Sequence, residues 1–261
     1  MGEAKSKKKR FLKAHPLCCY CGGNASATTS DHQPARTFFR QRVWPEHFEF
    51  PACEPCNQAS RESENLLGVV ILPSGADGDP SVVANFQWVH RNYPGVLEKI
   101  ASMDTRAKRQ AMKEAGVRPP VGESFAEQPL MRIEMSFWEP HLDMFARKML
   151  LSLFYQSFQV PLSSSGVMVH MYETNFEVAK NGDLPALAKL VPTLVMPKRS
   201  NVVLADQFSI RYATDKDTKT ALYVLNFHGN LFLTGVISET AQRLKKTAPP
   251  HTRFQTCLNH G

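Results

Sequence analysis

The stretch Asp31-His32, followed by Cys53-Glu54-Pro55-Cys56-Asn57, decides how this chain folds, because it sets an acid, a base and an amide beside paired cysteines. A second pair, Cys18-x-x-Cys21, lies upstream. Two such pairs are typical of a tetrahedral zinc site with thiolate ligands, and each pair here lies in a tight turn rich in Gly or Pro. The sequence therefore predicts a Zn²⁺ site formed by Cys18, Cys21, Cys53 and Cys56.

The other two cysteines leave one question open. Cys19-x-Cys21 is an alternative first pair, although the two-residue spacing favours Cys18. Cys257 is far from both pairs and is predicted to be a structural or free thiol. Because four of the six cysteines lie in CxxC pairs, they indicate metal ligands in a reducing compartment and not a disulfide framework.

The residues framed by these cysteines suit phosphodiester hydrolysis. That reaction needs a deprotonated water and a cation that takes up charge on the phosphate and the leaving oxygen. A neutral histidine supplies a base at about pH 7, which is the role we assign to His32. Asp31 and Asn57 offer oxygen ligands, which suit Mg²⁺ or Mn²⁺. A structural zinc ion and a catalytic divalent metal are therefore both predicted.

The same residues resemble the HNH endonucleases, which have a zinc-stapled ββα-metal fold. The likeness covers residues 15–70 and rests on Cys18-x2-Cys21, Asp31-His32-Gln33-Pro34, Phe50-Pro51-Ala52-Cys53-x2-Cys56-Asn57 and Ser60-Arg61-Glu62-Ser63-Glu64. It implies that Asp31 and Asn57 bind the catalytic metal and that His32 activates water. We expect residues 15–72, called the cysteine module below, to form a zinc-bound ββα-metal (HNH) finger.

One position departs from the family pattern. The family usually has an asparagine shortly before the third cysteine, and this asparagine holds the histidine in place. This chain has His47-Phe48 there. His47 and backbone carbonyl groups are the alternatives for orienting His32.

The order of elements expected in the cysteine module is a knuckle, a strand that reaches Asp31, a loop, a short strand over residues 48–51 and a helix from about Asn57 to Val70. Neighbouring side chains in a strand point to opposite faces, so Asp31 and His32 act together only at a strand end, which Pro34 also favours. Asn57 is expected to open the helix as its N-cap, where a helix N-terminus attracts phosphate.

The loop after His32 alternates basic and aromatic residues: Arg36, Arg40 and Arg42 with Phe38, Phe39 and Trp44. Arginine clamps phosphates, which predicts nucleic-acid contacts by Arg36, Arg40 and Arg42. The aromatic residues either stack on bases or pack in the core, and core packing is the commoner use.

Composition sets wider bounds. With 261 residues, 43% of them hydrophobic, the chain can bury one sizeable core or two smaller ones. The net charge of +7 is consistent with a polyanionic partner, here nucleic acid and most simply DNA. No apolar run reaches the ~18 residues of a membrane span and no apolar region follows the basic N-terminus, so we expect a cytoplasmic protein without membrane association.

Outside the cysteine module the pattern divides the chain further. Residues 1–14 form a basic arm that either runs along phosphates or only aids solubility. Residues 73–80 are dense in turn formers and mark a linker. Residues 81–261 read as a helical and α+β region, which makes the whole chain α+β. Its C-terminal end is basic again, with Lys245, Lys246 and Arg253.

The helical part of residues 81–261 is expected to hold several elements. A first helix begins at Ser81 and stops at Pro94, a second spans 94–103 and a third spans 104–115. After a connector over residues 116–129, a long buried helix covers residues 140–158.

The remaining part is expected to be antiparallel sheet. Residues 208–212 alternate as a strand, and residues 221–227 and 231–236 flank the tight turn His228-Gly229-Asn230 as a hairpin. These strands should pack on the long helix.

The leading hypothesis is a metal-dependent HNH endonuclease that cuts DNA. The first alternative is a zinc-stabilised module that binds nucleic acid without catalysis, since the orienting asparagine is missing. A zinc-stabilised adaptor that recruits a protein partner is a third hypothesis, and it leaves the basic segments unexplained.

Overall fold

The computed structural model of this chain describes residues 3–72, 79–116, 118–119, 121–127, 131–175, 177–178, 186–191 and 193–240, and the fold is given for these. Several predictions fall outside them: residues 73–78 of the linker, the basic residues Lys245, Lys246 and Arg253, and Cys257. Within the described residues the chain is mixed α+β with antiparallel sheets, as predicted.

The largest element is a five-stranded antiparallel sheet with the order β5-β11-β10-β9-β6. The strands are β5 (Val167–Thr174), β6 (Thr193–Val195), β9 (Phe208–Asp215), β10 (Thr220–Phe227) and β11 (Leu231–Ser238). The predicted hairpin is confirmed as β10 and β11, which pair from Thr220↔Ser238 to Phe227↔Leu231. Its turn needs positive φ at His228 (54°) and Gly229 (67°), and glycine adopts this conformation readily. The sequence missed β5 and β6.

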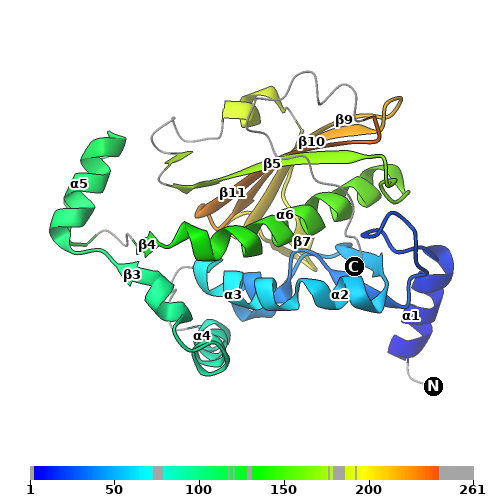
Figure 1. Ribbon diagram of the computed structural model, residues 1–261, viewed down its shortest axis with the longest axis horizontal. Helices are drawn as coiled ribbons and strands as arrows, with labels where there is room; N and C mark the ends of the chain where they lie inside the picture. The colour runs from blue at the N-terminus through cyan, green and yellow to red at the C-terminus, as the bar shows by residue number, and fades with distance from the viewer. Residues whose placement is uncertain are drawn as a thin grey trace.

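The long helix α6 (Met135–Phe158) lies between this sheet and the helices of the cysteine module (Figure 1). It begins five residues before the predicted start, so Pro140 is inside the helix. Trp138 lies in this added part of the helix and is 1% exposed. The free energy gained by burying its side chain outweighs the loss of the backbone hydrogen bond that Pro140 cannot donate.

The cysteine module contains two short antiparallel strands, β1 (Thr29–His32) and β2 (Glu49–Ala52), which pair with Asp31↔Phe50 and His32↔Glu49. The loop between them holds two 3₁₀ helices, η1 (Arg36–Phe38) and η2 (Arg40–Arg42). After β2 come α2 (Glu54–Ala59) and α3 (Arg61–Ile71). The predicted single helix from Asn57 is thus two helices that meet at Ser60.

Asn57 does not open a helix. Cys53 is the N-cap of α2 and Pro55 occupies the first turn, where proline's fixed φ and missing N–H are tolerated. The backbone N–H of Asn57 donates to the carbonyl oxygen of Cys53 at 3.0 Å, so Asn57 lies inside the helix. The N-cap prediction was therefore wrong by one turn.

The remaining elements flank this centre. They are α1 (Glu3–Ala14), α4 (Pro80–Asn92), η3 (Val96–Lys99), β3 (Ile100–Ser102), α5 (Thr105–Ala115), β4 (Met131–Ile133), η4 (Ala186–Leu190), β7 (Lys198–Arg199) and β8 (Val202–Val203). Strand β3 pairs with β4, and β7 pairs with β8. The basic arm is therefore helical over α1, and its lysines are exposed from Lys5 onward.

Two of the helices predicted in this part differ from the structure. Asp79, and not Ser81, caps α4, because the Asp79 carboxylate accepts a hydrogen bond from the backbone N–H of Ser81 at 2.8 Å. The helix predicted over residues 94–103 is wrong. Gly95 there has φ 84°, and the segment forms η3 and then β3, whose residues pair with β4.

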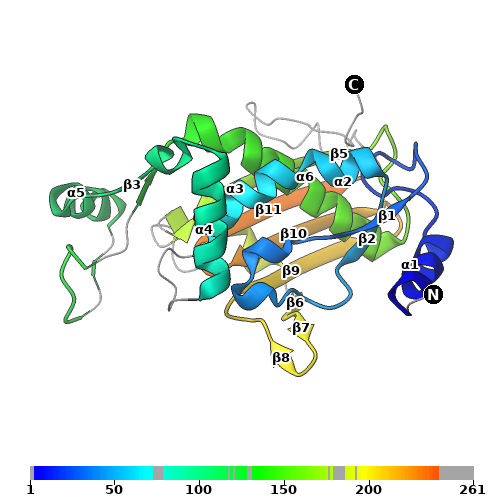
Figure 2. The same cartoon turned by 90° about the horizontal axis from the view of Figure 1, so that it is seen from below.

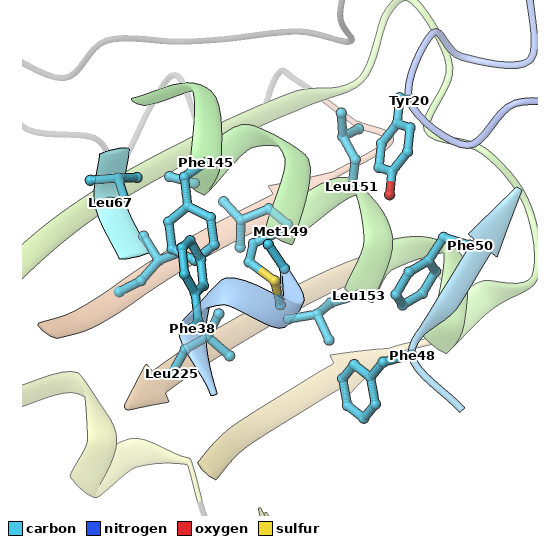
Figure 3. Packing of buried hydrophobic residues seen from close by; sticks show 14 of the residues in the cluster. Tyr20, Phe38, Phe48, Phe50, Leu67, Phe145, Met149, Leu151, Leu153 and Leu225 are labelled. Atoms are coloured by element: carbon cyan, nitrogen blue, oxygen red, sulfur yellow. The ribbon is translucent and has the colours of Figure 1, made fainter. Parts of the chain in front are cut away.

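Phenylalanines of the cysteine module fill the space between α6 and the sheet (Figure 3). The Phe38 ring lies 5.0 Å from the Phe145 ring of α6, and the Phe48 ring lies 5.8 Å from the Phe208 ring of β9. The four cysteine-pair residues, these rings and the inward residues of the sheet belong to one continuous cluster of buried side chains. The cysteine module thus shares its core with the C-terminal strands.

Gly235 of β11 faces Leu150 of α6 at close range. A Cβ atom at this position would lie 2.5 Å from the Cδ atoms of Leu150. We expect Gly235→Ala to lower the free energy of unfolding by about 1–3 kcal/mol, because overpacking forces backbone shifts. Urea unfolding measures it. In a double-mutant cycle, Leu150→Ala should relieve part of the destabilisation caused by Gly235→Ala. If the two losses of unfolding free energy were strictly additive, the contact would be contradicted.

Candidate metal and anion site

Four cysteines gather at one point of the cysteine module. The Sγ atoms of Cys18, Cys21, Cys53 and Cys56 all lie within 4.8 Å of one another, and all four residues are buried. Zinc–sulfur bonds of ~2.3 Å in a tetrahedron place sulfurs ~3.8 Å apart, so this arrangement fits such an ion after small adjustments. The four cysteines can therefore hold a metal ion such as Zn²⁺. Thiolates at all four positions leave no open position for substrate, which is the pattern of a structural ion.

Local turns produce this convergence. Gly22 and Gly23 have positive φ values of 70° and 77°, and the Gly23 N–H donates to the carbonyl oxygen of Cys18 at 3.1 Å, which folds the first pair back. A hydrogen bond from the Cys56 thiol lowers the pKa of Cys18 to about 5 even though burial opposes this shift. Cys18 is thus predisposed to the thiolate form that a metal requires.

Cys19 lies outside this cluster. Its side chain is buried away from the other four sulfurs, and burial raises the pKa of its thiol well above the ordinary value. The open choice between Cys18 and Cys19 is therefore settled for Cys18.

Asp31 is buried in an ion pair with a lysine from the long helix. The Nζ atom of Lys148 in α6 lies 2.8 Å from Asp31 Oδ2, and the Tyr20 hydroxyl donates to the same oxygen at 2.8 Å. Lys148 is 0% exposed and Asp31 is 7% exposed. The carboxylate predicted to bind a catalytic metal thus already has a cation as its partner.

A second carboxylate shares the same lysine. Glu64 Oε1 lies 3.2 Å from Lys148 Nζ, and the ammonium also donates to the Ser60 hydroxyl. The three donors of Lys148 are therefore all used. Burial, and then the nearby charge of Asp31, raise the pKa of Glu64, although Lys148 opposes the rise. We call Asp31, Glu64, Lys148, Ser60 and Tyr20 the buried ion network.

His32 lies at the end of β1 and points away from this network. The Arg36 guanidinium donates from Nη2 to His32 Nε2 at 2.5 Å. Since arginine only donates, Nε2 is the acceptor and we assign the ring proton to Nδ1. Nδ1 lies 3.9 Å from Glu49 Oε1, too far for a hydrogen bond. Burial and then Arg36 lower the pKa of His32, which favours the neutral imidazole.

Trp44 organises the arginines next to His32. The guanidinium carbon of Arg36 lies 3.6 Å from the centre of the Trp44 rings, and that of Arg199, from β7, lies 4.0 Å from it. Two guanidinium groups this close to one ring centre do not fit side by side, so they cover opposite faces of the indole. Trp44 thus supports the arginines and offers no bare face to a base.

The other predicted contact residues have different surroundings. Arg40 forms an ion pair with Asp206, so its charge is compensated away from His32. Arg42 is exposed. Burial and the charge of Arg199 lower the pKa of Arg36 most, and the charge of Arg42 adds a smaller lowering. Phe38 and Phe39 are 0% and 1% exposed, which makes them core residues and not base-stacking ones.

Two predicted residues are not joined to His32. The half-buried Asn57 lies on α2 beside β1, yet among the described residues its amide makes no hydrogen bond with Asp31 or His32. His47 is exposed with φ 63°. Glu49 faces His32 across the strand pair instead, with Oε1 3.9 Å from His32 Nδ1.

Sequence reasoning missed Glu49, Lys148 and Arg199. A signal existed for Glu49, because a short strand ending near Cys53 sets it opposite His32. Lys148 lies far from His32 in the chain, within a helix whose sequence pattern indicates only burial. Arg199 is also distant, and it lies in a segment that contains no motif.

Comparison of this chain with protein-family models, with curated proteins and with solved structures gave no match. Of the helices in the described ranges, none is both long enough and apolar enough to cross a membrane. The site is therefore interpreted from its own geometry.

The cysteine cluster predicts a defined metal content. We expect about one equivalent of Zn²⁺ per chain, because four thiolates form a closed tetrahedral site. Cys53→Ser should lose the ion and much of the fold, since metal binding and folding are coupled in small sites. Cys19→Ala is the matched control and should keep the ion. Elemental analysis and circular dichroism measure both, and a folded parent without bound metal would refute the site.

The buried ion network predicts a large stability effect. Lys148→Met leaves Asp31 and Glu64 buried without their cation, which should lower the free energy of unfolding by about 3–5 kcal/mol. Lys216→Met, at an exposed lysine in the β9–β10 turn, is the control. Urea unfolding compares the two. A loss under about 1 kcal/mol, the range of an exposed pair, would contradict the network.

Proposed function

We propose that this protein is an endonuclease that hydrolyses phosphodiester bonds in DNA, with His32 as the general base, and that it depends on a divalent metal. The order of two antiparallel strands and a helix around a cysteine cluster supports an HNH-type finger. The exposed lysines of α1 suit a polyanionic partner. A cytoplasmic location stays a prediction.

The observation that carries the proposal is the surrounding of His32. Its Nε2 is an acceptor, as a base requires, and the group that occupies it is a guanidinium that also binds phosphate well. A phosphodiester that draws Arg36 onto itself frees Nε2 for a water molecule. The base and the phosphate-binding group are thus adjacent before substrate arrives.

Asp31 and Asn57 are the residues that would hold the catalytic metal. Carboxylate and amide oxygens suit Mg²⁺ or Mn²⁺ in kind. In this arrangement, however, Asp31 Oδ2 is bound by Lys148 and Tyr20, so the residues do not fit a metal ion at Asp31 unless Lys148 moves. The metal dependence that we propose therefore rests on the resemblance to HNH endonucleases.

That same ion pair favours a second candidate, a zinc-stabilised module that binds nucleic acid without cutting it. A buried lysine that neutralises Asp31 makes the carboxylate a structural anchor. The arginines around Trp44 serve binding equally well.

The decisive experiment is cleavage of supercoiled plasmid by purified protein with and without added Mg²⁺ or Mn²⁺. If His32 is the base, His32→Ala should slow cleavage by about 10²–10⁴-fold while zinc content and DNA affinity stay. His90→Ala, at an exposed histidine of α4, is the matched control and should cut normally.

The outcomes separate the candidates. Cleavage that requires added metal and falls with Asn57→Ala supports a metal ion at Asp31 and Asn57. Cleavage that continues in the presence of excess chelator, with the zinc content unchanged, removes the divalent metal from the mechanism and keeps His32. A parent that binds DNA and never cuts it establishes the binding module, and a parent that ignores DNA refutes both candidates.

A further inference from the structure

The β7–β8 hairpin brings an arginine from the C-terminal region to His32. Figure 2 shows this hairpin extending beyond the five-stranded sheet on its β9–β6 side. Arg199 closes β7, and its guanidinium carbon lies 4.0 Å from the centre of Trp44. Residues more than 150 positions apart in the chain therefore meet around one indole ring.

Backbone contacts fix the hairpin to the cysteine module. The Glu46 N–H donates to the carbonyl oxygen of Lys198 at 2.8 Å, and the Ser200 N–H donates to Glu46 Oε1 at 3.1 Å. These bonds flank Arg199 on both sides. Its position beside Trp44 is thus held by the fold and does not depend on the side-chain stack alone.

The charges around Trp44 are not balanced. Burial, then Arg199 and Arg42, lower the pKa of Arg36, while Glu49 opposes this shift. Glu46 adds a second carboxylate beside the hairpin, so three guanidinium groups face two acids. In the described part of the chain Arg199 forms no ion pair. Like charges held together in this way repel one another, and an anion between them relieves the repulsion.

We propose that Arg199 is a phosphate-binding residue, so that the β7–β8 hairpin forms the second wall of the DNA interface at His32. The inference rests on the proposed function and deepens it. Arg36 and Arg199, on opposite faces of Trp44, straddle the ring edge and present two guanidinium groups to the backbone phosphates that pass His32. Stacking orders both side chains in advance, which reduces the entropy lost on binding.

The test is the salt dependence of DNA binding. Fluorescence anisotropy of a labelled 20-base-pair duplex, in buffer without added Mg²⁺ or Mn²⁺, gives the affinity across NaCl concentrations. Losing one phosphate contact should reduce the slope of log affinity against log salt by about 1 and weaken binding about fivefold at ~0.15 M salt. We expect this for Arg199→Ala. Arg199→Lys keeps the charge and should restore the slope.

The matched control is Arg106→Ala. It removes the same charge from an exposed position on α5, at the far end of the molecule from the hairpin in both Figure 1 and Figure 2, and should leave the slope unchanged. Thermal unfolding verifies that Arg199→Ala is folded. If the parent binds duplex and Arg199→Ala matches Arg106→Ala, the hairpin inference is wrong and the proposed function stands. If the parent binds no duplex, the proposed function fails and this inference fails with it.

Discussion

One buried ammonium group determines how the two parts of this chain fit together. Lys148 of α6 is fully enclosed, and its partners Asp31 and Glu64 come from β1 and α3 of the cysteine module. A buried charge is tolerated only when it is paired and hydrogen-bonded, so α6 and the module are held at one relative position. The phenylalanines that fill the space between α6 and the sheet depend on that position.

The same anchor fixes the direction of His32. Neighbouring side chains of a strand point to opposite faces, and β1 ends with Asp31 and then His32. Because Asp31 is held inward by Lys148, His32 must face the loop that carries Arg36 and Trp44. The placement of the candidate base is thus a consequence of the ion pair behind it.

Much of the local structure could be predicted from the sequence, because short-range chemistry decides it. The cysteine spacing predicted the sulfur cluster, and the turn His228-Gly229-Asn230 predicted the hairpin. The role of Asp31 could not be predicted, because its partner is 117 positions away, on a helix whose pattern gives only burial. Arg199 was missed for the same reason, since long-range packing leaves no periodic signal.

The distribution of charge across β1 bears on which of the two candidate functions is correct. On the inner side, Lys148 pairs with both Asp31 and Glu64. On the outer side, Arg36 and Arg199 lie around Trp44 beside His32, and Glu49 Oε1 lies 3.9 Å from His32 Nδ1. A free divalent cation is repelled by that outer side, whereas a phosphodiester is attracted to it. Binding of nucleic acid is therefore the property that both candidates share, because the same guanidinium groups that repel a free cation attract a phosphodiester.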